Sequence, residues 1–102
     1  MNIPAIELQK ALQEFQEWGE KLRTPYEIRI AKLLPHRSEK EISDIIEVCK
    51  KVESTAWEIA TSVRDEGLEK EAAIKIIKER FPFMNSANIT RTFGQAMYYT
   101  LK

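Results

Sequence analysis

The chain has 102 residues, which is enough for one compact domain. Apolar residues make up 43% of it, so we expect a folded chain and not a disordered one. Sixteen basic residues balance sixteen acidic ones, and this zero net charge removes the simplest argument for a nucleic-acid or membrane-surface partner.

The single cysteine, Cys49, cannot form a disulfide within one chain, which fits a reducing compartment. No apolar run approaches the roughly eighteen residues of a membrane span. Acidic residues follow soon after the first residues, so we expect no signal peptide. The composition therefore predicts a cytoplasmic protein without a membrane partner, and no motif indicates a cofactor.

A first helix is expected from about Pro4 to Leu22, with the proline in its first turn. Its apolar residues recur at the three- and four-residue intervals of one helix face. They are Leu8, Leu12, Phe15, Trp18 and Leu22.

A second, short helix is expected to follow Thr24, which can cap it, with Pro25 in the first helical position. Pro35 should stop this helix near Leu34. The spacing predicts two opposite faces: Ile28, Ala31 and Leu34 inward, and Arg29, Lys32 and His36 outward.

A long central helix is predicted over residues 38–66. Ser38 and Glu41 have the spacing of a capping box, and Gly67 lies where a left-handed residue would end the helix. One unbroken stripe of apolar residues runs between these signals: Ile42, Ile45, Cys49, Val52, Ala56, Ile59 and Val63. Ile46, Val48, Trp57 and Ala60 widen this stripe, so we expect the helix to be covered on more than one side.

The remainder predicts two further helices. The fourth should run from about Glu69 to Arg80, and the fifth from a cap at Asn85 or Ser86 to Leu101. The fifth helix should bury Ile89, Phe93, Met97 and one of two tyrosines, Tyr98 or Tyr99. No stretch alternates with the period of a strand. The sequence therefore predicts an all-α fold, a single-domain bundle of about five helices around the central one, over residues 1–102.

Two pairs of acidic residues have a spacing that can serve a metal ion. Glu17 and Glu20 are three residues apart, and so are Glu41 and Asp44. Two such pairs on facing helices can hold magnesium beside a polyphosphate. This ExxE and ExxD spacing resembles the metal-binding pattern of all-α nucleotide pyrophosphohydrolases of the MazG kind, on these four residues alone. The resemblance implies a magnesium-dependent pyrophosphohydrolase, and the alternative is that these acids face solvent.

Residues 69–102 can also be interpreted as a helix-turn-helix segment of a DNA-binding regulator. A polar stripe along the last helix carries residue types that contact base edges and phosphates: Asn88, Arg91, Gln95 and Lys102. The connection 81–85 is longer and more apolar than the usual turn of this motif.

The interpretation that we prefer is a helical interaction or scaffold protein that associates with itself or with another helical protein. The central helix is longer than its expected neighbours, so part of its apolar face should need a second copy to cover it. Aromatic residues of the kinds favoured at interfaces are Trp57, Trp18, Tyr98 and Tyr99. The sequence thus predicts a homodimer, with Trp57 at the interface.

Overall fold

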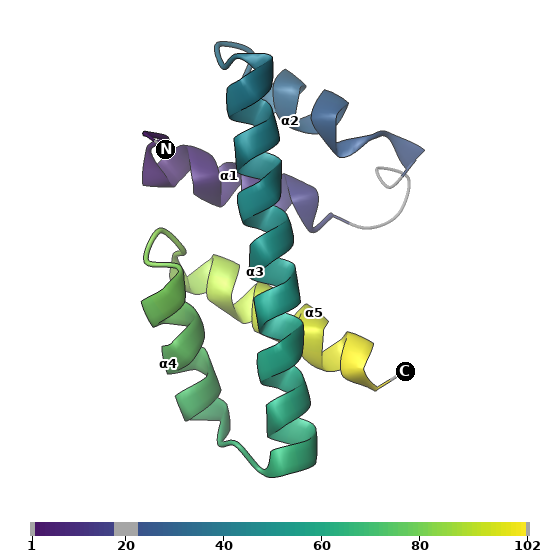
Figure 1. Ribbon diagram of the computed structural model, residues 1–102, viewed down its shortest axis with the longest axis vertical. Coiled ribbons are helices and arrows are strands. Elements are labelled where there is room, and N and C mark those ends of the chain that lie inside the picture. Colours follow the sequence, from purple (N-terminus) through teal and green to yellow (C-terminus); the bar gives the residue numbers. More distant parts are fainter. Residues whose placement is uncertain (1, 18–22, 102) are drawn as a thin grey trace. The chain divides into compact units, whose positions relative to one another are not determined.

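The structure, a computed structural model, describes residues 2–17 and 23–101 (Figure 1). Its five helices confirm the predicted all-α fold with one long helix, and the described residues contain no strand. In chain order they are α1 (Ala5–Phe15), α2 (Tyr26–Leu33), α3 (Glu39–Glu66), α4 (Lys70–Arg80) and α5 (Ser86–Thr100).

The chain divides into two compact units that share α3. We call Met1–Lys50 unit 1 and Lys51–Lys102 unit 2. Unit 1 therefore consists of α1, α2 and the first half of α3, and unit 2 consists of the second half of α3 with α4 and α5. That the two act as one domain stays a prediction.

Both ends of α3 lie where their local signals predict. The Glu41 N–H donates to Ser38 Oγ at 3.1 Å, and the Ser38 N–H donates to Glu41 Oε1 at 3.0 Å, which completes the capping box. At the other end Gly67 has a φ of 74°, and the next residue, Leu68, donates its N–H to the Ser62 carbonyl. A residue with a side chain would be strained at this φ, so glycine makes a sharp end here.

The apolar stripe of α3 is buried within one chain from Ile42 to Ala60. The exceptions lie at the edges of the stripe, where Val48 is half-buried and Trp57 is exposed. Ile45, Val52, Ala56 and Ile59 are all less than a tenth exposed, as predicted. The expectation that part of this stripe needs a second copy to cover it is therefore not supported. Of these two exceptions, Trp57 is the one with half of its surface exposed.

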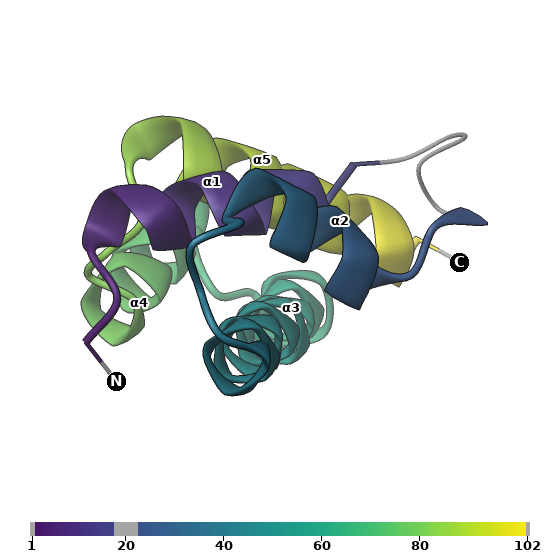
Figure 2. The ribbon, with the colours of Figure 1, turned by 90° about the horizontal axis from the view of Figure 1, so that it is seen from above.

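In unit 1, α1 and α2 lie side by side and cross the first half of α3 (Figure 2). α1 buries Leu8, Leu12 and Phe15 as expected, but it ends at Phe15 and not near Leu22. At this end the Arg29 Nη2 donates to the Glu14 carbonyl, and the Glu17 N–H donates to the same carbonyl at 3.3 Å. The Arg29 side chain thus donates to a carbonyl that would accept the backbone N–H four residues later if the helix continued for another turn.

The predicted register of α2 is wrong. Of the three residues predicted to face inward, Leu34 is buried but Ile28 and Ala31 are exposed, while Ile30 and Arg29, the latter predicted to face outward, are buried. Pro25 occupies the N-cap position that was assigned to Thr24. Relative to the prediction, α2 is rotated about its axis so that Arg29 faces inward. The Arg29 Nε lies 3.4 Å from the Glu14 carboxylate, and its guanidinium packs 5.3 Å from the centre of the Tyr26 ring.

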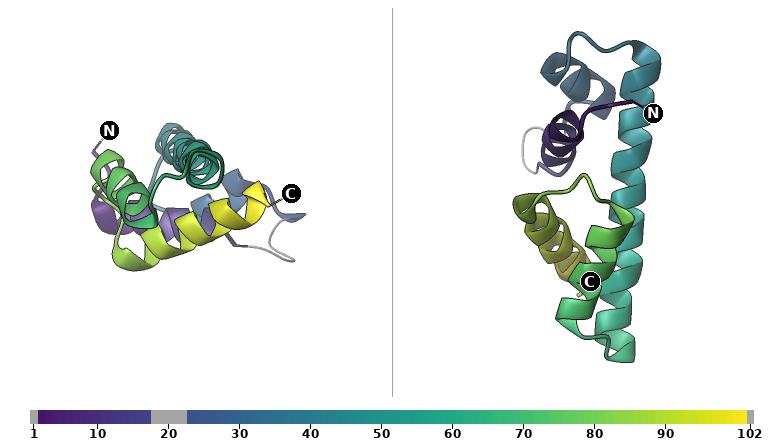
Figure 3. Two further views of the ribbon diagram at one scale, coloured as in Figure 1. Left: turned by 90° about the horizontal axis from the view of Figure 1, so that it is seen from below. Right: turned by 90° about the vertical axis from the view of Figure 1, so that its left-hand side faces the viewer.

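In unit 2, α4 runs back along the second half of α3 (Figure 3). Small residues bring α3 and α5 together, since Ala56, Ala60 and Ala96 form one buried cluster with Met97 packed against it. The Arg64 guanidinium on α3 donates to the Met97 carbonyl at 2.7 Å and to Thr100 Oγ1. The expectation that α5 buries one of its two tyrosines is wrong, because both are exposed.

Candidate functional site

An arginine in the loop between α2 and α3 joins the three helices of unit 1. Arg37 Nη2 and Nε donate to the two carboxylate oxygens of Glu7 at 2.8 and 2.9 Å, and Arg37 Nη1 donates to Glu41 Oε2 at 3.0 Å. Paired donation by a planar guanidinium is stronger and more directional than a single ion pair. The first turns of α1 and α3 are therefore held to one loop residue.

The charges around Glu7 shift its titration. Donation by the Arg37 side chain, aided by His36 Nε2 at 3.0 Å, lowers the pKa of Glu7 to about 2, against a smaller opposing effect of desolvation. The backbone N–H of Ser38, together with Arg37, lowers the pKa of Glu41. Both carboxylates are therefore ionised above pH 5 and serve to hold unit 1 together.

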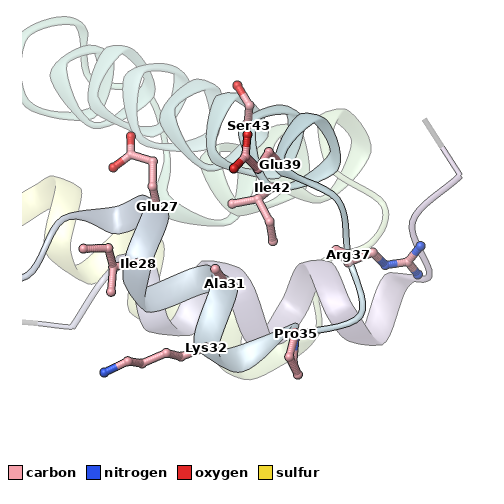
Figure 4. A pocket seen from close by; sticks show the side chains of 9 residues that line it. All are labelled: Glu27, Ile28, Ala31, Lys32, Pro35, Arg37, Glu39, Ile42 and Ser43. Atoms are coloured by element: carbon pink, nitrogen blue, oxygen red, sulfur yellow. The ribbon is translucent and has the colours of Figure 1, made fainter.

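One concave feature of unit 1 is an apolar groove between α2 and α3, with a volume of about 680 Å³ (Figure 4). Its apolar lining comes from Ile28, Ala31 and Pro35 on one side and from Ile42 on the other. Figure 4 shows Ile42 pointing from α3 towards α2. We call this feature the α2–α3 groove.

Charged side chains surround the α2–α3 groove. Glu27 lies on α2 and Glu39 on α3, while Lys32 extends away from the groove (Figure 4). Arg37 also lines it, but its guanidinium is engaged by Glu7 and Glu41. The groove thus combines an apolar interior with two acidic side chains, an arrangement suited to an apolar helix with a basic flank.

Sequence reasoning did not find this groove because it placed Ile28 and Ala31 in the core. α2 has eight residues and carries apolar side chains on every side, so its spacing does not define one buried face. One feature of the sequence does point to the groove: α2 carries more apolar residues than a helix of this length can bury on one face.

Unit 2 has its own exposed apolar side chains, which we call the α3–α5 apolar surface: Trp57, Tyr98, Tyr99 and Leu101. The two tyrosine rings meet edge to face, with their centres 5.9 Å apart. Trp57 lies two turns before Arg64 on the same face of α3, and Arg64 reaches the last turn of α5. Three of the four residues predicted at an interface are therefore exposed, and Trp18 lies outside the described residues.

Two of the four predicted metal-binding carboxylates, Glu41 and Asp44, have other partners. Glu41 binds Ser38 and Arg37, and Asp44 accepts a hydrogen bond from Lys40 Nζ at 3.2 Å. Glu17 lies beyond the end of α1, and Glu20 falls outside the described residues. Within residues 2–17 and 23–101, no three His, Cys, Asp or Glu side chains gather into a group that could hold a metal ion.

The predicted nucleic-acid stripe does not form one exposed row. Asn88 is buried, and its side chain completes a capping box with Asn85: the Asn85 N–H donates to Asn88 Oδ1 at 3.1 Å, and the Asn88 N–H donates to Asn85 Oδ1 at 2.8 Å. Arg91 and Gln95 are half-buried, and Lys102 is outside the described residues. Asn88 therefore caps α5, a role that its position after Asn85 could have indicated.

Comparison of the chain with protein-family models, curated proteins and solved structures gave no match. None of the helices in the described part of the chain has the length and apolarity needed to cross a bilayer.

Proposed function

We propose that this chain is a helical interaction protein that pairs with a second copy of itself. The observation that carries this proposal is that one chain exposes both an apolar groove and an apolar helix end. The α2–α3 groove is lined by Ile28, Ala31 and Ile42, and the last turn of α5 exposes Tyr98, Tyr99 and Leu101. Tyrosine and tryptophan are favoured at interfaces, where they dominate the binding energy.

The occupant that we infer for the α2–α3 groove is the last turn of α5 from the second copy. An apolar helical segment laid into a groove is a common mode of recognition. Charge supports this choice, because Glu27 and Glu39 flank the groove, whereas residues 80–102 contain no acidic side chain. Attraction between the two would favour this pairing over contact between two grooves.

Reciprocal exchange gives a closed dimer. If each copy places its α5 end in the groove of the other, the two contacts are identical and a twofold axis relates them. Trp57 is expected at the edge of each contact, because it lies on the side of α3 that Arg64 joins to the end of α5. A tryptophan with half of its surface exposed is then partly covered in the pair.

Light scattering at micromolar concentration tests the pairing. The wild type should have twice the mass of one 11.9-kDa chain. Ile28→Glu should shift the mass towards that of one chain, because it places a charge in the apolar groove. Ile6→Glu is the matched control, since Ile6 is an isoleucine on α1 that is at least as exposed as Ile28 and does not line the groove.

The outcomes separate clearly. A wild-type mass of one chain contradicts self-association, and a dimer that Ile28→Glu leaves intact contradicts the role of the groove. Trp57→Ala should weaken the dimer without dissociating it fully, because Trp57 lies at the edge of the proposed contact.

A further inference from the structure

A second concave feature of unit 1 lies beside Arg29, on another side of α2. Its volume is about 360 Å³, and it is lined by Glu14, Thr24, Arg29, Lys32 and Leu33. Among the described residues that line this cavity are two cations, one hydroxyl and one carboxylate.

Arg29 is the unusual member of this set. Its side chain is only 5% exposed, and two of its nitrogens are used by Glu14, one by the carbonyl and one by the carboxylate. The remaining nitrogen, Nη1, is buried and finds no hydrogen-bond partner among the residues that the structure describes. A buried charged donor without an acceptor is costly, so a small shift of the Arg29 side chain that brings Nη1 to an acceptor in the cavity is favoured.

The charge of the cavity favours an anion as that acceptor. The Glu14 carboxylate lies 3.4 Å from Arg29 Nε, which is longer than the 2.7–2.9 Å typical of a strong charge-assisted bond. Lys32 adds a second positive charge, and it has no carboxylate partner among the described ion pairs. Guanidinium, ammonium and hydroxyl groups are the donors that proteins use to bind oxyanions.

We propose that this cavity binds an oxyanion, the carboxylate or phosphate group of a ligand, through Arg29 and Lys32 with the Thr24 hydroxyl as a third donor. The available volume exceeds that of several water molecules, each of which occupies about 30 Å³ in the liquid, so a carboxylate or phosphate fits with water around it. The two sites share Lys32, but Thr24, Arg29 and Leu33 line this cavity and not the α2–α3 groove, so Thr24→Val tests the anion site separately from the proposed pairing.

Nuclear magnetic resonance on the labelled full chain tests this site. Sodium phosphate and sodium acetate are titrated separately at constant ionic strength, with sodium chloride as the balancing salt. The Arg29 side-chain signals and the Thr24 and Lys32 amides should shift and saturate, while the Ile77 amide in unit 2 should not. Tighter binding of phosphate indicates a phosphate ligand, and tighter binding of acetate indicates a carboxylate ligand.

Variants separate the site from a general effect of charge. Lys32→Gln and Thr24→Val should each weaken binding, the first by about tenfold because it removes a charged donor. Lys10→Gln, at an exposed position of α1 that does not line the cavity, should leave the affinity unchanged. Arg29→Gln should abolish binding, and circular dichroism reports whether that variant keeps its helices.

Two results would overturn the proposal. One is the absence of saturable shifts at Thr24, Arg29 and Lys32 with both anions, as expected if the cavity holds only water. The other is an affinity that Lys32→Gln and Thr24→Val lower no more than Lys10→Gln does.

Discussion

Arg37 binds Glu7 through two parallel contacts, with Nη2 2.8 Å from Oε2 and Nε 2.9 Å from Oε1, across thirty residues of sequence. The third guanidinium nitrogen holds Glu41 at the start of α3. A residue between α2 and α3 therefore fixes the first turns of two other helices. Because this geometry needs a planar fork, lysine at position 37 could not replace it.

The ion pair predicts how acid affects stability. The pKa of Glu7 is lowered to about 2 from an ordinary value of 4.5, so its contribution is complete above pH 4.5 and is lost as the pH falls towards 2. Glu7→Gln should therefore lower the urea midpoint at pH 7 and flatten its decline between pH 4.5 and 2.

Glu71→Gln provides the control for this measurement. Glu71 also lies in the first turn of its helix, but it has no ion pair among the described contacts. A midpoint that declines equally steeply in wild type and Glu7→Gln would show that this pair does not account for the acid sensitivity.

The capping box of α5 predicts a loss of stability when its first residue is truncated. Asn85→Ala should lower the free energy of unfolding by about 1 kcal/mol, because the Asn88 N–H loses its acceptor, Asn85 Oδ1, while the backbone N–H at position 85 can still donate to Asn88 Oδ1. Ser86→Ala, one residue later and exposed, should change it by less than about 0.5 kcal/mol. Urea denaturation measures both, and equal effects would mean that the cap contributes nothing measurable.

The shared helix α3 leads us to expect one cooperative domain. Ile45 is fully buried in unit 1, so Ile45→Ala should cost about 2–4 kcal/mol. If the chain is one domain, the same loss of free energy should lower the protection of the α4 and α5 amides, which belong to unit 2, against hydrogen exchange. Hydrogen exchange followed by mass spectrometry measures this peptide by peptide. Unchanged protection of α4 and α5 would show that the units unfold separately.

Features fixed by neighbouring residues could be predicted from the sequence. Ser38, Glu41 and Gly67 locate the ends of α3 within a residue, because each acts through backbone groups a few positions away. The stripe from Ile42 to Ile59 is long enough for its period to define the buried face.

Features that depend on distant partners could not be predicted. The register of α2 follows from the burial of Arg29 against Glu14, fifteen residues earlier, and no local pattern indicates that contact. The same holds for Arg37 and Glu7, and therefore for the α2–α3 groove that opens once Ile28 turns outward.

The most direct test of the proposed pairing mixes two variants that each lose one half of the contact. Ile28→Glu keeps an intact α5 end, and Tyr98→Ala keeps an intact groove, so each alone should sediment mainly as one chain. Mixed in equal amounts, they should form a dimer in analytical ultracentrifugation that is weaker than that of the wild type, because one of the two reciprocal contacts is restored: the intact groove of the Tyr98→Ala chain takes the intact α5 end of the Ile28→Glu chain. A mixture that sediments as the sum of its two components, while the wild type is a dimer, would contradict the groove-and-helix contact.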